Sequence, residues 1–267
     1  MNPAFVHHGG AADEGTESSV LLLHGAGMDH TVWRGLARHL AHHGRRVLAP
    51  DFPGHGRTPG PPLQSIEEMA AWVMGLLDDE GVSETTIVGH SMGGLVALRL
   101  AAMVGSVVNG LVLVCSATRL DVHSELQQAA DARDHKAVEL ILAWSFGAGG
   151  RMGGMSDPGV SALVTCRRVL ERGLDVLGSD LRACTGYVGG SQDAVVIQAP
   201  SLVVSGSEDR MVRPGLAAAL AGILTGARFE LVPGGGHMLM VQQPERVRRL
   251  VDGMLASGRL LGSQADV

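Results

Sequence analysis

The chain has 267 residues, of which 45% are hydrophobic and 18% are charged, a composition typical of a soluble globular protein with a substantial core. Its 27 acidic and 21 basic side chains give a formal net charge of −6, which disfavours nucleic acid and anionic membrane surfaces as partners. The longest apolar stretch, around residues 92–117, is interrupted by Arg99, Ser106 and Asn109. We therefore expect it to be buried core and predict no membrane span.

Cysteine usage and the N-terminal stretch indicate a reducing compartment. The cysteines are odd in number and have no CxxC spacing, so reduced structural thiols are expected at Cys115, Cys166 and Cys184. Residues 1–15 contain no apolar run flanked by basic side chains, so no signal peptide is expected. Together these features predict a cytoplasmic protein.

Along the chain, short apolar runs that end in turn residues alternate with longer amphipathic stretches. The sequence predicts strands at residues 20–23, 46–50, 85–88, 111–115, 201–205 and 228–232. It predicts helices at about residues 32–42, 65–80, 94–102 and 244–257. Apolar strands separated by helices are typical of a mainly parallel sheet that helices cover on both faces.

The alternation stops between residues 118 and 195. Helices are expected there at about residues 122–145, 159–172 and 175–187, with a glycine-rich break at 147–155. We interpret this region as a helical cap with a mobile segment, inserted into a core formed by residues 1–117 and 196–267. A surface loop without a role is the alternative for the break.

The stretch Gly89-His90-Ser91-Met92-Gly93 lies between a predicted strand and a predicted helix. A serine at such a junction, with glycine two residues away on either side, is typical of a nucleophile elbow. The sharp turn strains the serine backbone, projects its Oγ from the sheet and leaves no room for side chains at the two glycine positions. Ser91 is therefore the candidate nucleophile, with Met92 expected to line the site and His90 to pack in the core.

The chain resembles the α/β-hydrolase-fold family in four motifs: His24-Gly25-Ala26-Gly27, Asp51-Phe52-Pro53-Gly54-His55-Gly56-Arg57-Thr58, Gly89-His90-Ser91-Met92-Gly93-Gly94 and Gly234-Gly235-Gly236-His237. The resemblance covers about residues 18–117 and 196–256. It implies an α/β-hydrolase fold, with a mostly parallel sheet between helices and an inserted helical cap. Family members usually carry an antiparallel edge hairpin, but residues 5–8 are the one candidate strand before the strand at 20–23. A truncated edge, and about seven strands in all, are therefore expected.

A serine hydroxyl is a poor nucleophile near neutral pH and needs an adjacent base, which in turn needs an orienting acid. The family's chain order is nucleophile, acid, histidine, and the resemblance implies His237 as the base and Asp209 as the acid. Glu208 is the neighbouring rival for the acid. The other site that this fold uses for the acid follows the strand at 111–115 and has no carboxylate until Asp121.

The tetrahedral intermediate of acyl transfer needs two N–H donors aimed at its oxyanion. The N–H of Met92 opens the helix after Ser91 and adds the positive end of the helix dipole. The N–H of Ala26 is the expected second donor, with Gly27 as its substitute.

The expected substrate pocket is apolar and poor in aromatic rings. Its expected lining residues are Gly27, Trp144, Met152, Met155 and Met238. Flexible aliphatic side chains favour a small-molecule substrate with a medium-sized aliphatic acyl group. No cofactor and no metal ion are expected, because neither histidine pair, at 7–8 or 42–43, has a further ligand at metal-binding spacing.

A Ser–His–Asp site with an oxyanion hole favours acyl transfer to water. We expect a carboxylesterase-like serine hydrolase that cleaves a small carboxylic ester, lactone or thioester through an acyl-enzyme on Ser91. One alternative is hydrolysis of a carbon–carbon bond in ring-fission dienoic acids, for which family members add a cap arginine that binds a carboxylate. The candidates for that arginine are Arg151, Arg167, Arg168 and Arg172. A ligand-binding signalling member of the fold is the other alternative.

Overall fold

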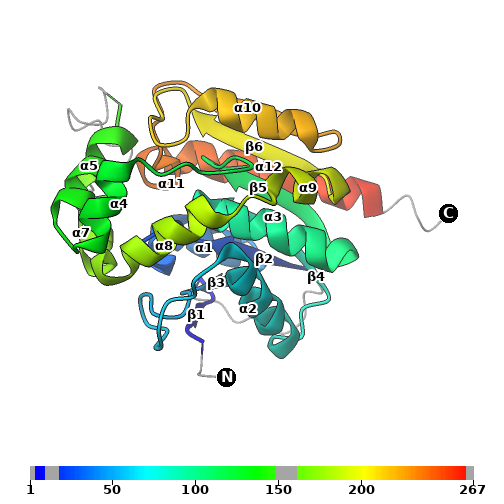
Figure 1. Ribbon diagram of the computed structural model, residues 1–267. Coiled ribbons are helices and arrows are strands. Elements are labelled where there is room, and N and C mark those ends of the chain that lie inside the picture. Colours follow the sequence, from blue (N-terminus) through cyan, green and yellow to red (C-terminus); the bar gives the residue numbers. More distant parts are fainter. Residues whose placement is uncertain (1–3, 10–17, 148–160, 263–267) are drawn as a thin grey trace.

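Seven strands form one sheet in the order β1-β3-β2-β4-β5-β6-β7 (Figure 1). The structure, a computed structural model, describes residues 4–9, 18–147 and 161–262. The strands are β1 (Val6–His7), β2 (Ser18–Leu23), β3 (Arg46–Pro50), β4 (Glu84–His90), β5 (Val108–Val114), β6 (Ser201–Gly206) and β7 (Arg228–Val232). Only β1 runs antiparallel to its neighbour, and all other neighbouring pairs are parallel. The predicted fold class, with about seven strands and a short N-terminal edge, is confirmed.

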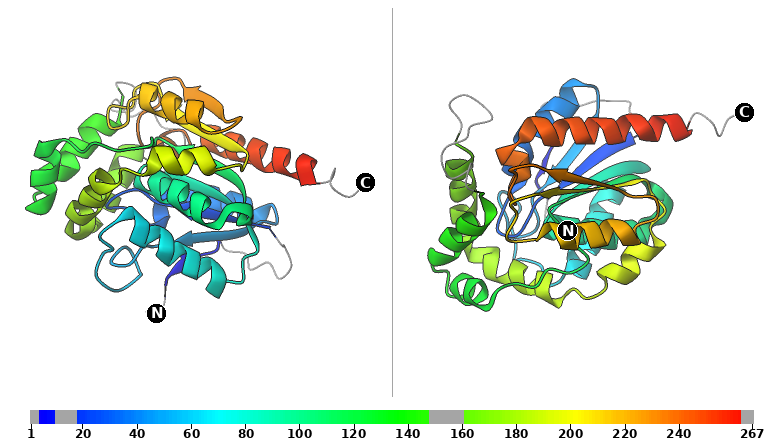
Figure 2. Two further views of the ribbon diagram at one scale, coloured as in Figure 1. Left: turned by 45° about the vertical axis from the view of Figure 1, so that its right-hand side comes forward. Right: turned by 90° about the horizontal axis from the view of Figure 1, so that it is seen from above.

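Helices cover both faces of this sheet. One face carries α2 (Ile66–Asp79), α3 (Met92–Val104), α9 (Gly190–Val196) and α10 (Pro214–Ile223), and the other carries α1 (Arg34–His42) and α12 (Pro244–Gly262). In the right-hand view of Figure 2, α12 (red) and α10 (gold) lie on opposite sides of the sheet. Two 3-10 turns, η1 (His30–Trp33) and η2 (Gly105–Val107), and the short helix α11 (Leu239–Gln242) complete this part of the fold.

The double-sided burial follows from the strand period of two. In β2, Val20 and Leu22 pack with the α1 and α12 side chains, whereas Leu21 and Leu23 pack with those of α2 and α3. All four side chains are at most 1% exposed. A continuous apolar run is therefore what this strand requires.

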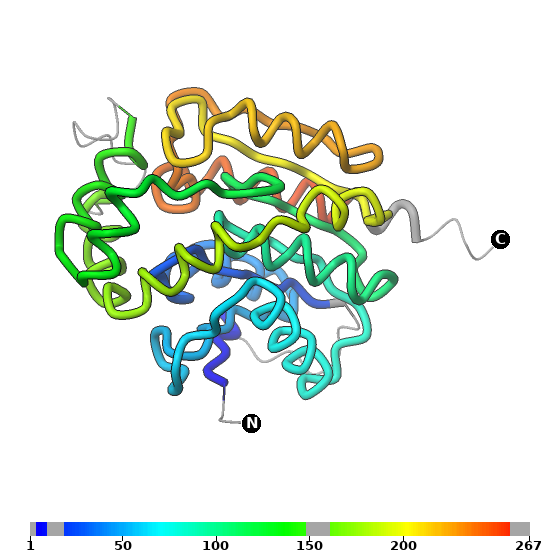
Figure 3. Tube along the Cα trace, in the orientation of Figure 1, coloured from blue at the N-terminus to red at the C-terminus, as the bar shows by residue number. Residues whose placement is uncertain are grey.

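The segment between β5 and β6 forms α4 (Ser124–Asp131), α5 (Lys136–Ser145), α7 (Ala162–Arg172) and α8 (Leu174–Gly186) before α9. The trace in Figure 3 leaves the sheet after β5, passes through these four helices and returns along α3 as α9. The single helix predicted at 122–145 is wrong, because the chain turns between α4 and α5, where Arg133 has a φ of 54°. The glycine-rich break lies mostly outside the described residues.

Two further properties concern the described residues as a whole. None of their helices combines the length and the apolar character that a membrane crossing needs. Cys115, Cys166 and Cys184 are free thiols and are buried, and burial raises the pKa of Cys166 to about 12.

Candidate active site

Ser91 joins β4 to α3 in a strained backbone conformation. Its φ of 51° and ψ of −114° lie in a region that residues other than glycine rarely adopt. A Cβ on Gly89 would lie 2.3 Å from the carbonyl oxygen of Gly93, and one on Gly93 would lie 2.3 Å from that of Leu23. The close packing of this turn therefore requires glycine at both positions.

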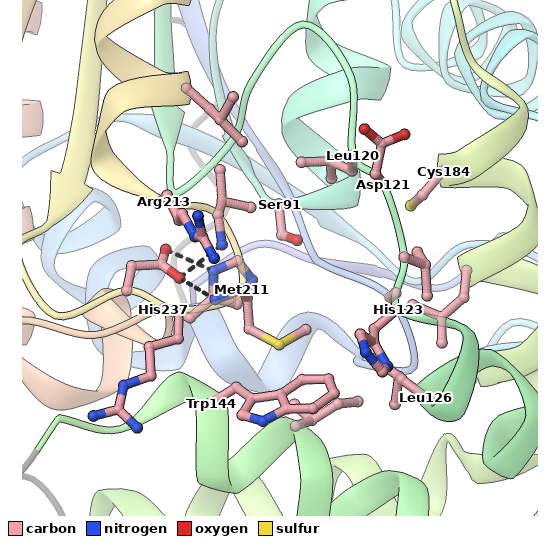
Figure 4. Close-up of a pocket in the computed structure, with 18 of the residues that line it drawn as sticks. Ser91, Leu120, Asp121, His123, Leu126, Trp144, Cys184, Met211, Arg213 and His237 are labelled. Atoms are coloured by element: carbon pink, nitrogen blue, oxygen red, sulfur yellow. Dashed lines mark hydrogen bonds and ion pairs between the residues drawn. The ribbon is translucent and has the colours of Figure 1, made fainter.

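Hydrogen bonds hold the Ser91 backbone from several directions. Its N–H donates to Val114 O at 3.0 Å, and its carbonyl oxygen accepts from the N–H of Gly94 and the hydroxyl of Ser116, both at 2.9 Å. The side chain lines a cavity (Figure 4). Within the described part of the chain its hydroxyl has no hydrogen-bond partner, which leaves it available to a ligand.

The imidazole of His237 and the carboxylate of Asp209 form a buried pair. His237 Nδ1 lies 2.9 Å from Asp209 Oδ2 (Figure 4). Asp209 Oδ1 accepts the N–H groups of Met211 and Val212, both at 2.8 Å. Because the carboxylate accepts, Nδ1 carries the imidazole proton and Nε2 keeps its lone pair. Glu208 is not among the residues that line the cavity.

His90 contacts both the main chain and the ring of His237. Its Nε2 lies 2.9 Å from the carbonyl oxygen of His237, and the two rings are 4.8 Å apart. Burial lowers the pKa of His90 well below 6.5, so this imidazole is neutral and its Nε2–H donates. Its Nδ1 is buried without a partner and lies 2.7 Å from where a Cβ on Gly25 would stand.

The main chain of His237 is also tied to the inserted helices. Its N–H donates to Ser145 O, the last residue of α5, at 2.8 Å. A Cβ on Gly236 would lie 1.9 Å from the same oxygen, so only glycine permits this approach.

The expected oxyanion donors are the main-chain N–H groups of Ala26 and Met92. Neither the N–H of Ala26 nor that of Met92 has an acceptor among residues 4–9, 18–147 and 161–262, and Ala26 lines the cavity. The N–H of Gly27 differs, because it donates to Asp180 Oδ2 at 2.7 Å. The Met92 side chain is buried in the core beside α2 and does not line the cavity.

Asp180, on the inserted helix α8, belongs to a cluster of buried polar side chains. Its Oδ2 lies 2.8 Å from His55 Nε2, and both side chains are 0% exposed. Although burial opposes it, the Asp180 charge raises the pKa of His55. Burial lowers the pKa of the adjacent His24 to about 4, so His24 is neutral and its Nε2 accepts the N–H of Phe52.

One cluster among the described residues has the ligand types of a metal site. Donor atoms of Cys115, Asp209 and His237 lie within 4.8 Å of one another. Burial raises the pKa of the Cys115 thiol well above its ordinary value, and its Sγ approaches Gly236 O at 3.7 Å. The protonated thiol and the hydrogen-bonded imidazole account for this cluster without a metal ion.

The cavity has a volume of about 930 Å³ and is lined both by loops of the core and by residues of α4, α5 and α8. Its apolar lining includes Leu120, Val122, Leu126, Ile141, Trp144, Leu181 and Met238. Of the residues expected in the pocket, Trp144 and Met238 lie here, Gly27 does not, and Met152 and Met155 are outside the described residues.

Sequence reasoning did not anticipate Asp180, Arg210 or Arg213. Asp180 lies within a predicted helix, where a carboxylate usually faces solvent, and its partner His55 is 125 positions away. Arg210 and Arg213 flank the short turn after Asp209 and line the cavity. Their closeness to the predicted acid was the one signal that the sequence offered.

A family model and several known proteins match most of the length of this chain. The model described as "Alpha/beta hydrolase family" matches residues 20–250. The pimeloyl-[acyl-carrier protein] methyl ester esterase of Yersinia enterocolitica is 28% identical over 88% of this chain and 92% of that protein. The 2-hydroxy-6-oxo-2,4-heptadienoate hydrolase of Pseudomonas putida is 26% identical over 92% of this chain and 91% of that protein.

Higher identity is confined to part of the chain. Lipase LipV of Mycobacterium tuberculosis is 38% identical over 113 residues, which are 42% of this chain and 42% of that protein. The chain thus matches less than half the length of this relative. Among solved structures, the enol-lactonase of Burkholderia xenovorans LB400 has a TM-score of 0.82 at 24% identity, and the match covers 95% of this chain and 97% of that one. This likeness shows the shared fold.

Proposed function

The chain belongs to the alpha/beta hydrolase family, and from that premise we propose that it is a serine hydrolase of small carboxylic esters, lactones or thioesters. The observation that carries the proposal is the buried 2.9 Å contact between His237 Nδ1 and Asp209 Oδ2, in the cavity that Ser91 also lines. A nucleophile, a base and an orienting acid are the groups that acyl transfer to water requires.

In the acylation step, His237 Nε2 takes the proton of the Ser91 hydroxyl while Oγ bonds to the acyl carbon. The negative charge of the tetrahedral intermediate is stabilised by the N–H groups of Ala26 and Met92. When the intermediate collapses, the bond to the leaving oxygen or sulfur breaks and that atom receives the proton from Nε2. Asp209 stabilises the imidazolium throughout.

Deacylation repeats these roles with water as the nucleophile. Nε2 takes a proton from water as its oxygen attacks the acyl carbon, and returns the proton to Ser91 Oγ when the acyl bond breaks. The structure shows no hydrogen bond between the Ser91 hydroxyl and His237, and such contacts often tighten only once substrate is bound.

We assign the role of a cap to the four helices α4, α5, α7 and α8. They lie over the carboxyl ends of the parallel strands, where α/β folds bind their ligands, and contribute Leu126, Ile141, Trp144 and Leu181 to the cavity. In this proposal the cap selects the acyl group that enters the cavity.

The relative named 2-hydroxy-6-oxo-2,4-heptadienoate hydrolase supports a second candidate, carbon–carbon bond hydrolysis. A panel of p-nitrophenyl esters, thioesters, lactones and ring-fission dienoates distinguishes the two. The proposal expects turnover of esters or thioesters by the wild-type chain and none by Ser91→Ala. Esters left untouched while dienoates are cleaved would replace the first candidate with the second.

A fluorophosphonate probe supplies an independent measurement. It should label Ser91, identified by peptide mass spectrometry, and should not label Ser91→Ala. Ser83→Ala is the matched control, because Ser83 is exposed and does not line the cavity. Equal labelling of the wild-type chain and Ser91→Ala would show that Ser91 is not the nucleophile.

A further inference from the structure

Two arginines stand on the cavity wall beside the Asp209–His237 pair. Arg210 and Arg213 both line the cavity, and both are exposed to solvent. They lie in the connection between β6 and α10, with Arg213 at the N-cap of α10. In the view of Figure 4, Arg213 lies on the His237 side of the cavity, across from Leu126.

Neither guanidinium group has a partner among the residues that the structure describes. Within the described ranges, no ion pair and no side-chain hydrogen bond involves Arg210 or Arg213. Arg172 provides a contrast, because it is paired with Asp29. The cavity wall therefore carries two positive charges at this place, although the chain has a net charge of −6.

The acidic side chains that line the same cavity are already engaged. Asp121 is paired with Arg119 at 2.7 Å, and Asp209 accepts from His237 and from two main-chain N–H groups. The positive charge of Arg210 and Arg213 is therefore not cancelled by a carboxylate among the described residues of the cavity wall.

The two arginines are attached to a fixed turn. Asp209 Oδ1 accepts the N–H groups of both intervening residues, Met211 and Val212, and the N–H of Arg210 donates to Trp144 O at 3.3 Å. Because the same carboxylate orients His237, the bases of both side chains hold a set position relative to the reacting atoms.

We propose that Arg210 and Arg213 form an anion subsite, so that the substrate is an ester or thioester that carries a carboxylate or phosphate group. This inference rests on the proposed hydrolase function. The apolar remainder of the cavity receives the hydrocarbon part of the substrate, and the guanidinium pair receives its charged end. The shared chemistry is a multi-oxygen anion several bonds away from the scissile carbonyl.

The anionic group can belong to the acyl part of the substrate or to its leaving group. Pairs of substrates that differ only in this group distinguish the two possibilities. A carboxylate on the acyl side distinguishes the monomethyl ester of octanedioic acid from methyl octanoate. A phosphate on the leaving group distinguishes octanoyl phosphopantetheine from octanoyl N-acetylcysteamine. The quantity measured is the ratio of kcat/KM for the anionic substrate to that for its neutral counterpart.

The wild-type chain should prefer one anionic substrate by about tenfold or more, and Arg210→Gln/Arg213→Gln should bring that ratio close to one. The preference should also shrink when the ionic strength is raised to about 0.5 M. The matched control is Arg249→Gln, which removes an exposed charge on α12 away from the cavity and should keep the wild-type ratio.

Three results overturn the inference: equal turnover of anionic and neutral substrates by the wild-type chain, a ratio that survives in the double variant, or an equal loss in Arg249→Gln. If no ester or thioester is hydrolysed, the proposed function fails first. Calorimetric binding to Ser91→Ala then decides the inference alone, with octanedioate compared with octanoate, and phosphopantetheine with pantetheine. Binding that favours the anion and is lost in the double variant supports the subsite, and equal binding rejects it.

Discussion

His90 Nε2 donates to the carbonyl oxygen of His237 at 2.9 Å, so one buried histidine holds the main chain of the other. The residue beside the proposed nucleophile thereby positions the proposed base, which lies 147 positions later in the chain. Sequence reasoning assigned His90 a packing role only. Burial keeps it neutral, and its proton must stay on Nε2 to make this bond.

His90→Leu should therefore lower both stability and turnover. It leaves the His237 carbonyl without its buried donor, which costs about 1–3 kcal/mol in the free energy of unfolding. His90→Gln, whose amide nitrogen can occupy the position of Nε2, should retain most of both. Urea unfolding and ester kinetics measure the two effects, and equal behaviour of the two variants would remove the positioning role.

Asp209→Asn should reduce kcat by about 10³–10⁴-fold with little change in KM, because the amide no longer stabilises the imidazolium or its correct tautomer. Glu208→Gln, the same chemical change at the neighbouring position, is the control and should stay close to wild type. Steady-state kinetics on a p-nitrophenyl ester compares them. A larger loss in Glu208→Gln would transfer the role of the acid to that residue.

Asp180 links α8 to the loop that carries Ala26, the proposed second oxyanion donor. Asp180→Leu removes the acceptor of the Gly27 N–H and the partner of His55, and breaking such a buried pair costs about 3–5 kcal/mol. Chemical denaturation measures the loss. In a double-mutant cycle with His55→Gln, we expect a coupling free energy above about 1 kcal/mol. Additive effects would show that the pair is not coupled.

Acid should destabilise the fold between pH 6.5 and 4. The pKa of folded His24 is about 4, so in this window unfolded His24 binds a proton that the folded chain does not. The free energy of unfolding then falls with decreasing pH, by about 3 kcal/mol for this residue. His90 acts in the same direction, whereas His55, whose pKa is raised, contributes stability that is lost as the pH rises through its folded-state pKa.

The test compares how steeply the free energy of unfolding of each variant changes with pH, rather than its absolute value. His24→Gln should lose less free energy of unfolding between these pH values than the wild-type chain. His42→Gln replaces an exposed histidine and should follow the wild-type curve. An unchanged slope in His24→Gln would contradict the assignment of the acid sensitivity to this residue.

Gly93→Ala should abolish activity and lower stability by about 3 kcal/mol or more, because its Cβ would lie 2.3 Å from Leu23 O, a main-chain atom of the central sheet. Gly222→Ala is the control, since a Cβ there meets nothing within 4 Å. This helical substitution should be neutral or stabilising by up to about 1 kcal/mol. Thermal unfolding distinguishes them, and similar melting temperatures would contradict the packing argument.

The sheet was predictable because its strands are apolar runs that end in turn residues. The expected bounds of the strands at 46–50 and 228–232 agree with the structure. The helix expected at about 65–80 is also present, as α2, and Ser65 caps it by accepting the N–H of Glu68 at 3.1 Å. The turn at Arg133 was missed because no glycine marks its positive φ.

The site was predictable only where it is local in sequence. Ser91 and its glycines form one motif, and the resemblance supplied Asp209 and His237. Contacts such as His90 to His237 and Asp180 to Gly27 join residues 147 and 153 positions apart. No local pattern encodes them, since they depend on how segments that are distant in the chain pack together.

The Ser145 carbonyl oxygen, which accepts the His237 N–H, connects the end of α5 directly to the main chain of the proposed base. A bulky acyl group that displaced the end of α5 would, through this hydrogen bond, also displace His237 from Ser91. Substrates with long acyl chains should therefore show a lower kcat as well as a higher KM, so that the position of the end of α5 limits the length of the acyl chain.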